Sequence, residues 1–201
     1  PLSTGVNYWL AMHLETAMGD DAIKAIVITG AGRAFIAGAD IRNFGKTLPA
    51  DLPKPTRSAG AWLEGGTKPV VAAINGTAFG GGLEHALTCH YRVIKPGAEV
   101  GLPEVKLGIL PGGGGTQRLP RLIGVRNAMI PILTGDPFPT EQAVELGIVD
   151  ALIEDDDFVE GAINWARQLV ADGKGVRRIR DMTEHTEADR ANPAIFDEGA
   201  A

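Results

Sequence analysis

Two glutamates of this 201-residue chain stand in glycine-rich, apolar segments. Glu84 follows residues 79–83 (FGGGL), and Glu104 follows residues 101–103 (GLP). A carboxylate in such surroundings is costly to ionise unless it is paired, and this is how proteins tune carboxyl groups for acid and base catalysis. The alternative for each is a surface glutamate, or a first-turn residue that the helix dipole favours.

Backbone amides complete the chemistry that these glutamates suggest. Residues 80–82 are glycines that precede an expected helix, so they offer unobstructed N–H groups at its positive end, a natural site for an oxyanion. Residues 37–40 (AGAD) form a second small-residue segment whose backbone can approach a ligand. Two amide donors and two carboxylates together predict acid–base chemistry on a carbonyl compound.

Other motifs fail on a required residue. Residues 30–32 (GAG) follow an expected strand, but a dinucleotide-binding loop needs its third glycine where Phe35 stands. Residues 45–47 (GKT) resemble the end of a P-loop, but Asp40 stands at its first glycine. The two serines lie in no nucleophile elbow, and the four histidines have no metal-ligand spacing, so no metal is expected. Cys89 is more typical of a small buried hydrophobe than of a nucleophile.

Strands and helices alternate along the chain, which predicts the α/β class. Thr4 and Thr140 are the expected N-caps of two helices, and the first helix should bury the face that Val6 shares with Leu14. The expected strands are 23–29, 70–74, 91–94, 99–102 and 148–153, and the expected helices are 6–19, 59–63, 81–89, 114–123, 140–146 and 157–171.

Composition limits the remaining classes. The length favours one domain, and no apolar stretch approaches a membrane span. The net charge of −6 argues against nucleic acid and against an anionic membrane surface as partners. One cysteine cannot form an intrachain disulfide, which favours an intracellular protein. From Lys174 onward the chain is polar, and its basic residues up to Arg180 are expected to be a solvated face, with a functional cluster as the alternative.

Five segments, in order, resemble the crotonase (enoyl-CoA hydratase/isomerase) family. They cover residues 34–41, 68–84, 103–119, 133–136 and 143–149. The resemblance extends over roughly residues 1–170, and it implies a spiral of repeated ββα units that binds an acyl-CoA thioester. In such enzymes two backbone N–H groups polarise the thioester carbonyl, and by position these belong to Ala39 and Gly81.

The resemblance also assigns the two glutamates. Hydratases of the family use carboxylates at the positions of Glu84 and Glu104, which stand twenty residues apart here. By analogy Glu104 gives a proton to the α-carbon while Glu84 holds and activates water. The implied function is hydration of 2-enoyl-CoA in fatty-acid β-oxidation, with no separate cofactor because coenzyme A is part of the substrate. The alternatives are an enoyl-CoA isomerase, which is also a possible side activity, another CoA lyase of this fold, or a non-catalytic module that binds acyl-CoA or a partner protein.

Further residues follow from the same resemblance. Arg42 is a speculative partner for a CoA phosphate, and a solvated surface cation is its alternative. The remaining expected substrate-binding positions are Ala37, Gly38, Asp40, Ile41, Gly80, Pro103 and Gly112.

The chain departs from the family beyond its core. We expect an acyl-CoA-binding core at residues 1–173, a polar linker or truncated edge at 174–201, and the family's C-terminal closing helices to be missing. The tail resembles the stretch after the hydratase region of bifunctional hydratase/3-hydroxyacyl-CoA dehydrogenases. The implied assembly is a homotrimer or larger oligomer, or a fusion to a dehydrogenase region. The implied location is cytoplasmic in a bacterium and mitochondrial or peroxisomal in a eukaryote.

Overall fold

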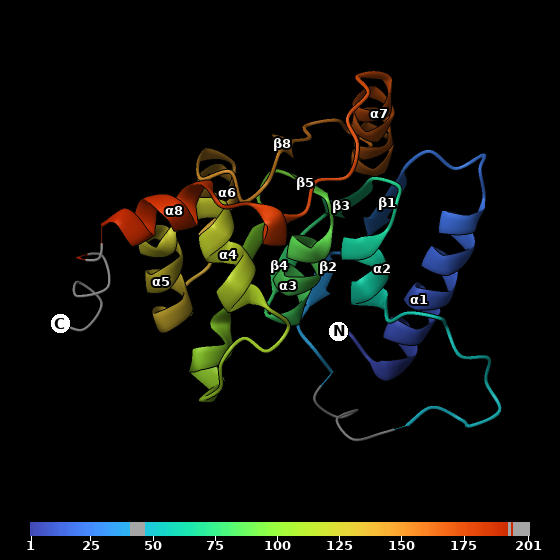
Figure 1. The fold of residues 1–201 in the computed structure, drawn as a ribbon, viewed down its shortest axis with the longest axis horizontal. Coiled ribbons are helices and arrows are strands. Elements are labelled where there is room, and N and C mark those ends of the chain that lie inside the picture. Colours follow the sequence, from blue (N-terminus) through green and yellow to red (C-terminus); the bar gives the residue numbers. More distant parts are fainter. Residues whose placement is uncertain (41–46, 193, 195–201) are drawn as a thin grey trace.

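The computed structural model describes residues 1–40, 47–192 and 194 (Figure 1). Ile41 and Arg42, two of the expected binding residues, lie outside the described residues. The elements in chain order are α1 (Thr4–Gly19), β1 (Ile26–Thr29), β2 (Ala34–Ala37), α2 (Ala59–Gly65), β3 (Val70–Ile74), β4 (Thr77–Phe79), α3 (Gly81–Thr88), β5 (Tyr91–Ile94), β6 (Glu99–Gly101), the 3-10 helix η2 (Pro103–Leu107), α4 (Gly115–Ile123), α5 (Val125–Thr134), β7 (Phe138–Pro139), α6 (Thr140–Glu145), β8 (Ala151–Leu152), α7 (Phe158–Ala171), the 3-10 helix η3 (Ile179–Asp181) and α8 (Glu184–Ala191).

The strands form two four-stranded sheets. One has the order β1-β3-β5-β8, and all its pairs are parallel. The other has the order β2-β4-β6-β7, in which only the β6–β7 pair is antiparallel. From β1 to β6, consecutive strands therefore enter different sheets, and helices follow each pair of strands: α2 follows β2, α3 follows β4, and η2 with α4 follows β6. This confirms the predicted α/β spiral of ββα units.

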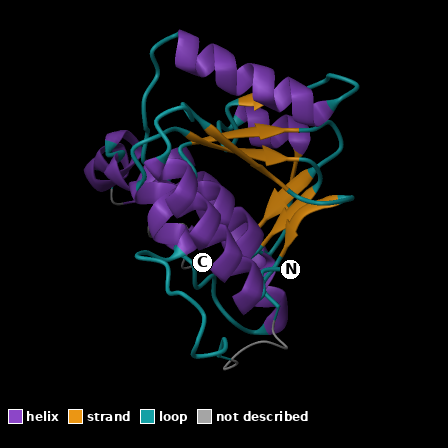
Figure 2. Cartoon of the chain, turned by 90° about the vertical axis from the view of Figure 1, so that its right-hand side faces the viewer, coloured by secondary structure: helices purple, strands orange, loops and turns teal. Residues whose placement is uncertain are grey.

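Strand β3 lies at the centre of the molecule, and all five of its residues are fully buried. Because side chains alternate along a strand, Val71 and Ala73 pack on one face, in a cluster that includes Phe158 of α7, whereas Val70 and Ile74 pack on the other in the main core. Figure 2 shows the two sheets inclined to one another, with helices on both sides. A strand buried on both faces requires the continuous apolar run that the sequence has here.

The register of the second sheet aligns three chain segments. Ala37 of β2 pairs with Phe79 of β4, which pairs with Gly101 of β6. These strands are parallel, so the residues that follow each of them leave the sheet at the same edge. Two or three residues beyond these partners stand Ala39, Gly81 and Glu104. The sheet thus gathers three expected site residues that are far apart in the sequence.

A buried arginine connects β5, in the β1-β3-β5-β8 sheet, to other segments of the chain. Arg92 of β5 is fully buried, its Nε donates to the carbonyl of Ile148 (2.7 Å), and its Nη1 donates to that of Cys89 (3.0 Å). Asp150 accepts from the Arg92 backbone N–H at 2.7 Å and lies 3.6 Å from its Nη2. Sequence analysis missed this residue, since an isolated arginine in a strand pattern gives no sign of its distant partners.

Three local expectations were wrong. Ser3, not Thr4, is the N-cap of α1, and its hydroxyl accepts from Val6 N–H at 3.1 Å. Val6 is 49% exposed, so the expected apolar face of α1 is not buried as a whole. Thr140 is the first residue of α6 rather than its cap, because its hydroxyl donates to the carbonyl of Ala98 (2.7 Å) across the fold.

Residues 174–192 contain η3 and α8. Ile179 is buried in the main core, and the Asp189 carboxylate accepts from the backbone N–H of Val125 (2.9 Å) at the start of α5. The domain boundary after residue 173 stays a prediction. Within the described part of the chain, no helix is both long and apolar enough to cross a bilayer.

Two helical glycines provide a test of this packing. A Cβ on Gly82 would lie 1.9 Å from the backbone oxygen of Ile36, whereas a Cβ on Gly60 would have no atom within 4 Å. We expect Gly82→Ala to destabilise the fold by at least ~1–3 kcal/mol, because α3 must move away from β2. Gly60→Ala should stabilise it by ~0.4–1 kcal/mol by restricting the unfolded chain. Urea unfolding of both variants measures the difference, and equal effects would contradict the close approach of α3 to β2.

Candidate active site

Glu84 lies in the first turn of α3 and is 5% exposed. Its Oε1 accepts hydrogen bonds from the backbone N–H groups of Gly113 (2.7 Å) and Gly115 (2.8 Å). Gly114 is the N-cap of α4, so this carboxylate caps a second helix as well as standing at the start of its own. Both helix dipoles favour its negative charge. Among the described residues no hydrogen bond reaches its other oxygen, Oε2.

The backbone at residues 113 and 115 can approach Glu84 this closely only because both residues are glycine. A Cβ on Gly113 would lie 2.6 Å from Glu84 Oε2, and one on Gly115 would lie 3.2 Å from Glu84 Cγ. The expected binding residue Gly112 has open space around its Cβ position, so the structure places its neighbour Gly113 against the carboxylate instead. The run of four glycines at 112–115 was visible in the sequence, but not which of its N–H groups is used.

Glu104 is held very differently. It lies in η2 directly after Pro103, is 9% exposed, and its buried Oε2 has no hydrogen-bond partner in the described part of the chain. Burial raises the pKa of this carboxyl group above its ordinary value, and the negative charge of Glu84 raises it further. Gly80, with a φ of 56°, leaves room for it, because a Cβ there would lie 3.0 Å from Glu104 Oε1.

The two expected amide donors lie side by side. A Cβ on Gly81 would be 3.7 Å from the backbone nitrogen of Ala39. Leu2 forms a β-bridge with this segment: its N–H donates to the carbonyl of Gly38, and its carbonyl accepts from the N–H of Asp40, both at 2.9 Å. Because backbone groups alternate along an extended chain, this bridge leaves the Ala39 N–H pointing to the opposite side.

The Ala39 and Gly81 segments line a cavity of about 380 Å³. The two amide segments and Glu84 converge there, together with side chains of α1. Its lining residues are Leu2, Thr4, Asn7, Ala39, Asp40, Gly81, Glu84, His85 and Gly113. Of the other expected binding residues, Ala37 ends β2 and Gly38, with a φ of 89°, turns the chain toward Ala39.

His85 and Asn7 belong to the site but were not among the expected residues. The Nδ1 of His85 lies 3.0 Å from the carbonyl of Gly81, and its Nε2 lies 3.1 Å from Asn7 Oδ1. Burial lowers the pKa of His85, so the ring is neutral at physiological pH. This pair ties the start of α3 to α1. A polar residue on each of two helices was too weak a signal to find it from sequence.

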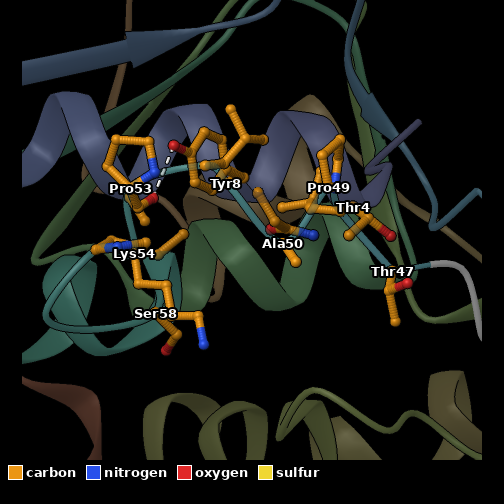
Figure 3. Close-up of a pocket in the computed structure, with 14 residues that line it drawn as sticks. Thr4, Tyr8, Thr47, Pro49, Ala50, Pro53, Lys54 and Ser58 are labelled. Carbon is orange, nitrogen blue, oxygen red and sulfur yellow. Dashed lines mark hydrogen bonds between the residues drawn. The ribbon is translucent and has the colours of Figure 1, made fainter.

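Two further cavities adjoin the first. One, of about 780 Å³, shares Glu84, His85 and Gly113 with it and extends to a group of polar side chains, which are Arg57, Ser58, Glu64, Thr88, Arg118, Arg178 and Arg180. The other, of about 610 Å³, lies between α1 and residues 47–55 (Figure 3). The hydroxyl of Tyr8 donates to the carbonyl of Pro53 there, at 2.8 Å, and Thr4 and Asn7 line both this cavity and the first.

The arrangement has the parts for acid–base chemistry at a carbonyl. Glu84, with one oxygen fixed by amides, is suited to accept a proton on the other. Glu104, with a raised pKa, is suited to hold a proton and give it up. Paired N–H groups beside them could stabilise negative charge that develops on an oxygen atom.

The raised pKa of Glu104 has a consequence for stability. A carboxyl group whose pKa is higher in the folded than in the unfolded state stabilises the fold only while it is protonated, and this contribution is lost as the pH rises through the folded pKa. Glu104→Gln should therefore raise the melting temperature at neutral pH. The gain should vanish below about pH 4.5, the ordinary glutamate value. Melting curves across this range measure it, with the exposed Glu99→Gln as control. A pH-independent effect of Glu104→Gln would contradict the assignment.

Comparisons with known proteins show the family of this chain. The family model described as "Enoyl-CoA hydratase/isomerase" matches residues 3–197. A peroxisomal bifunctional enzyme of Danio rerio is 44% identical over 182 residues, which are 90% of this chain and 25% of that protein. The peroxisomal fatty acid beta-oxidation multifunctional protein MFP2 of Arabidopsis thaliana is 43% identical over 84% of this chain and 24% of its own length. This chain thus spans about a quarter of the curated relatives that it matches.

A solved structure extends the likeness to three dimensions. The enoyl-CoA hydratase of Mycobacterium tuberculosis H37Rv superposes with a TM-score of 0.75 at 31% identity, over 99% of this chain and 78% of that one. The fold, the order of the motifs and the family model agree over nearly all described residues. The chain therefore belongs to the enoyl-CoA hydratase/isomerase family.

Proposed function

We propose that this protein adds water across the double bond of 2-enoyl-CoA thioesters, using Glu84 and Glu104 as its acid–base pair. One observation supports this most directly. The charge of a carboxylate fixed by two amides helps raise the pKa of a buried carboxyl group, and that carboxylate shares a cavity with two backbone segments suited to bind a carbonyl oxygen. An addition of water needs both a proton acceptor and a proton donor.

The thioester carbonyl would bind between Ala39 and Gly81. Addition at the β-carbon moves negative charge onto the thioester oxygen, so N–H donors aimed at that oxygen bind the transition state more tightly than the substrate. Each such donor contributes roughly 3–4 kcal/mol in comparable sites. The first N–H groups of α3 have no partner within their own helix, and its dipole adds to their effect.

The glutamates would divide the two protons of the reaction. Glu84 Oε2 accepts a proton from water as the water oxygen bonds to the β-carbon. Glu104, protonated at the start, gives its proton to the α-carbon, and transfer of a proton from Glu84 to Glu104 restores the enzyme. The fixed Oε1 of Glu84 limits rotation of its carboxylate, so the basic oxygen stays in one place.

The wider setting is part of the proposal. Relatives are named as peroxisomal bifunctional or fatty acid β-oxidation proteins, and they are about four times as long as the matched region. We place this chain in the same intracellular pathway, as the hydratase region of a longer or assembled enzyme in which an adjoining 3-hydroxyacyl-CoA dehydrogenase consumes the product.

Substitution of Glu104 tests the mechanism. Glu104→Gln keeps the size of the side chain but cannot give up a proton in the same way, so we expect kcat for crotonyl-CoA hydration to fall by about 10²–10⁴-fold. The loss of the conjugated-thioester absorbance follows the reaction. Glu99→Gln, an exposed change in β6, is the matched control and should leave the rate unchanged.

Other outcomes would redirect the assignment. Equal rates in the native protein and Glu104→Gln would remove Glu104 from the chemistry. Tight acyl-CoA binding without turnover in the native protein would favour a non-catalytic module. Turnover of 3-enoyl but not 2-enoyl thioesters would favour an isomerase.

A further inference from the structure

The 780 Å³ cavity beside Glu84 contains an ion pair that has no part in the mechanism above. Glu64 of α2 and Arg118 of α4 lie 54 residues apart in the chain, and Arg118 Nε lies 2.9 Å from Glu64 Oε1. The side chain of Arg118 is only 17% exposed, and that of Glu64 only 12%. A largely buried pair costs more desolvation than a surface pair, so its presence at this cavity calls for a structural reason.

Arg118 reaches from this pair to the glycine turn at residues 112–115. Its Nη1 donates to the carbonyl oxygen of Gly113 at 2.9 Å. Gly114, with a φ of 97°, makes this possible, because a Cβ there would lie 2.1 Å from Nη1. The guanidinium group thus holds Glu64 with one edge and the turn with another, a geometry that a lysine ammonium cannot reproduce.

The same turn holds the catalytic carboxylate. The N–H groups of Gly113 and Gly115 both donate to Glu84 Oε1. Gly113 is therefore fixed on both sides, through its carbonyl by Arg118 and through its N–H by Glu84. Any shift of the turn would change the direction of Glu84 Oε2, the oxygen that would face the reacting water.

Glu64 is itself firmly placed. Its backbone carbonyl accepts from Arg178 Nε at 2.8 Å and lies 3.3 Å from His90 Nε2. The second carboxylate oxygen lies 3.5 Å from Nη1 of Arg180. Glu64 is thus linked to His90, the residue before β5, and to the segment around η3.

We infer that the Glu64–Arg118 pair is a positioning unit for Glu84, which fixes the 112–115 turn so that one carboxylate oxygen is held and the other stays aimed at water. This inference rests on the proposed hydratase function. Arg118 and Glu64 are positioning residues, because neither is expected to touch the reacting atoms.

Arg118→Met removes both contacts of the guanidinium group, and Arg121→Met is its control on the same helix. Arg121 is half-buried, and its Nη1 donates to the backbone carbonyl (2.7 Å) and to Oε1 (3.3 Å) of Gln117, one turn earlier in α4. We expect Arg118→Met to lower kcat for crotonyl-CoA hydration on the order of 10²-fold, because small misplacements of a reacting group are costly. KM should change by no more than about twofold, since the substrate contacts remain. Arg121→Met should change neither constant.

Glu64→Gln provides an independent test that keeps the shape of the side chain. The kcat of Glu64→Gln should also fall. The double variant Glu64→Gln/Arg118→Met should have a kcat no lower than that of Arg118→Met alone, because both changes release the same turn. In a Glu84→Gln background, Arg118→Met should lower kcat little further, since the carboxylate that it would position is gone. Melting temperatures show in each case whether the variant is folded.

Several results would overturn the inference. They are equal kcat values for Arg118→Met and Arg121→Met, independent losses that multiply in the double variant, a loss explained by the unfolded fraction, or a rise in KM at unchanged kcat. These all leave native turnover intact and so spare the proposed function. Absence of hydration by the native protein would instead refute the proposed function, and this inference with it.

Discussion

A buried carboxyl group must be hydrogen-bonded or neutral, and the two glutamates of this site meet that requirement in different ways. Two N–H groups at the start of α4 bind one oxygen of Glu84. In the described part of the chain no donor reaches the buried oxygen of Glu104, and burial together with the negative charge of Glu84 raises the pKa of this carboxyl group. This contrast between two chemically identical side chains is the basis for the proposed roles of Glu84 as base and Glu104 as acid.

The remainder of the fold brings backbone close to these two groups. The strands β2, β4 and β6 are parallel, so the residues that follow them, Ala39, Gly81 and Glu104, lie at one edge of the sheet. The pairing of Ala37 with Phe79 and of Phe79 with Gly101 sets their positions along the strand direction. Helix α3 then packs so closely on β2 that Gly82 has no room for a side chain. Gly30 and Gly76 likewise stand where backbone segments touch one another, and Gly113 stands against a carboxylate.

Sequence reasoning predicted the parts of this structure that depend on local pattern. The β3 run and the helix that begins within the glycines at 80–82 were visible because burial on both faces and a glycine-rich helix start leave strong local signals. Resemblance to a family supplied the pairing of Glu84 with Glu104, which local pattern had left open.

Contacts between distant residues were not predictable in this way. Arg92 and Arg118 look like surface cations in the sequence, because their partners stand about 50 or more residues away or are backbone carbonyls. The polar stretch after residue 173 likewise gave no sign that Ile179 would enter the core or that Asp189 would reach the start of α5. A charged residue is buried only when its partners are in place, and a single sequence does not show which residues those are.

The steric limits around Glu84 also restrict which substitutions this site could accept. At positions 80, 82, 113 and 114 a side chain would meet a carboxylate, a carbonyl or a guanidinium group, so these positions are closed to evolutionary change. By contrast, Arg57, Ser58 and Ala61 on the wall of the neighbouring cavity are exposed. Substitutions along α2 and the segment before it could thus reshape this cavity while the surroundings of Glu84 stay unchanged.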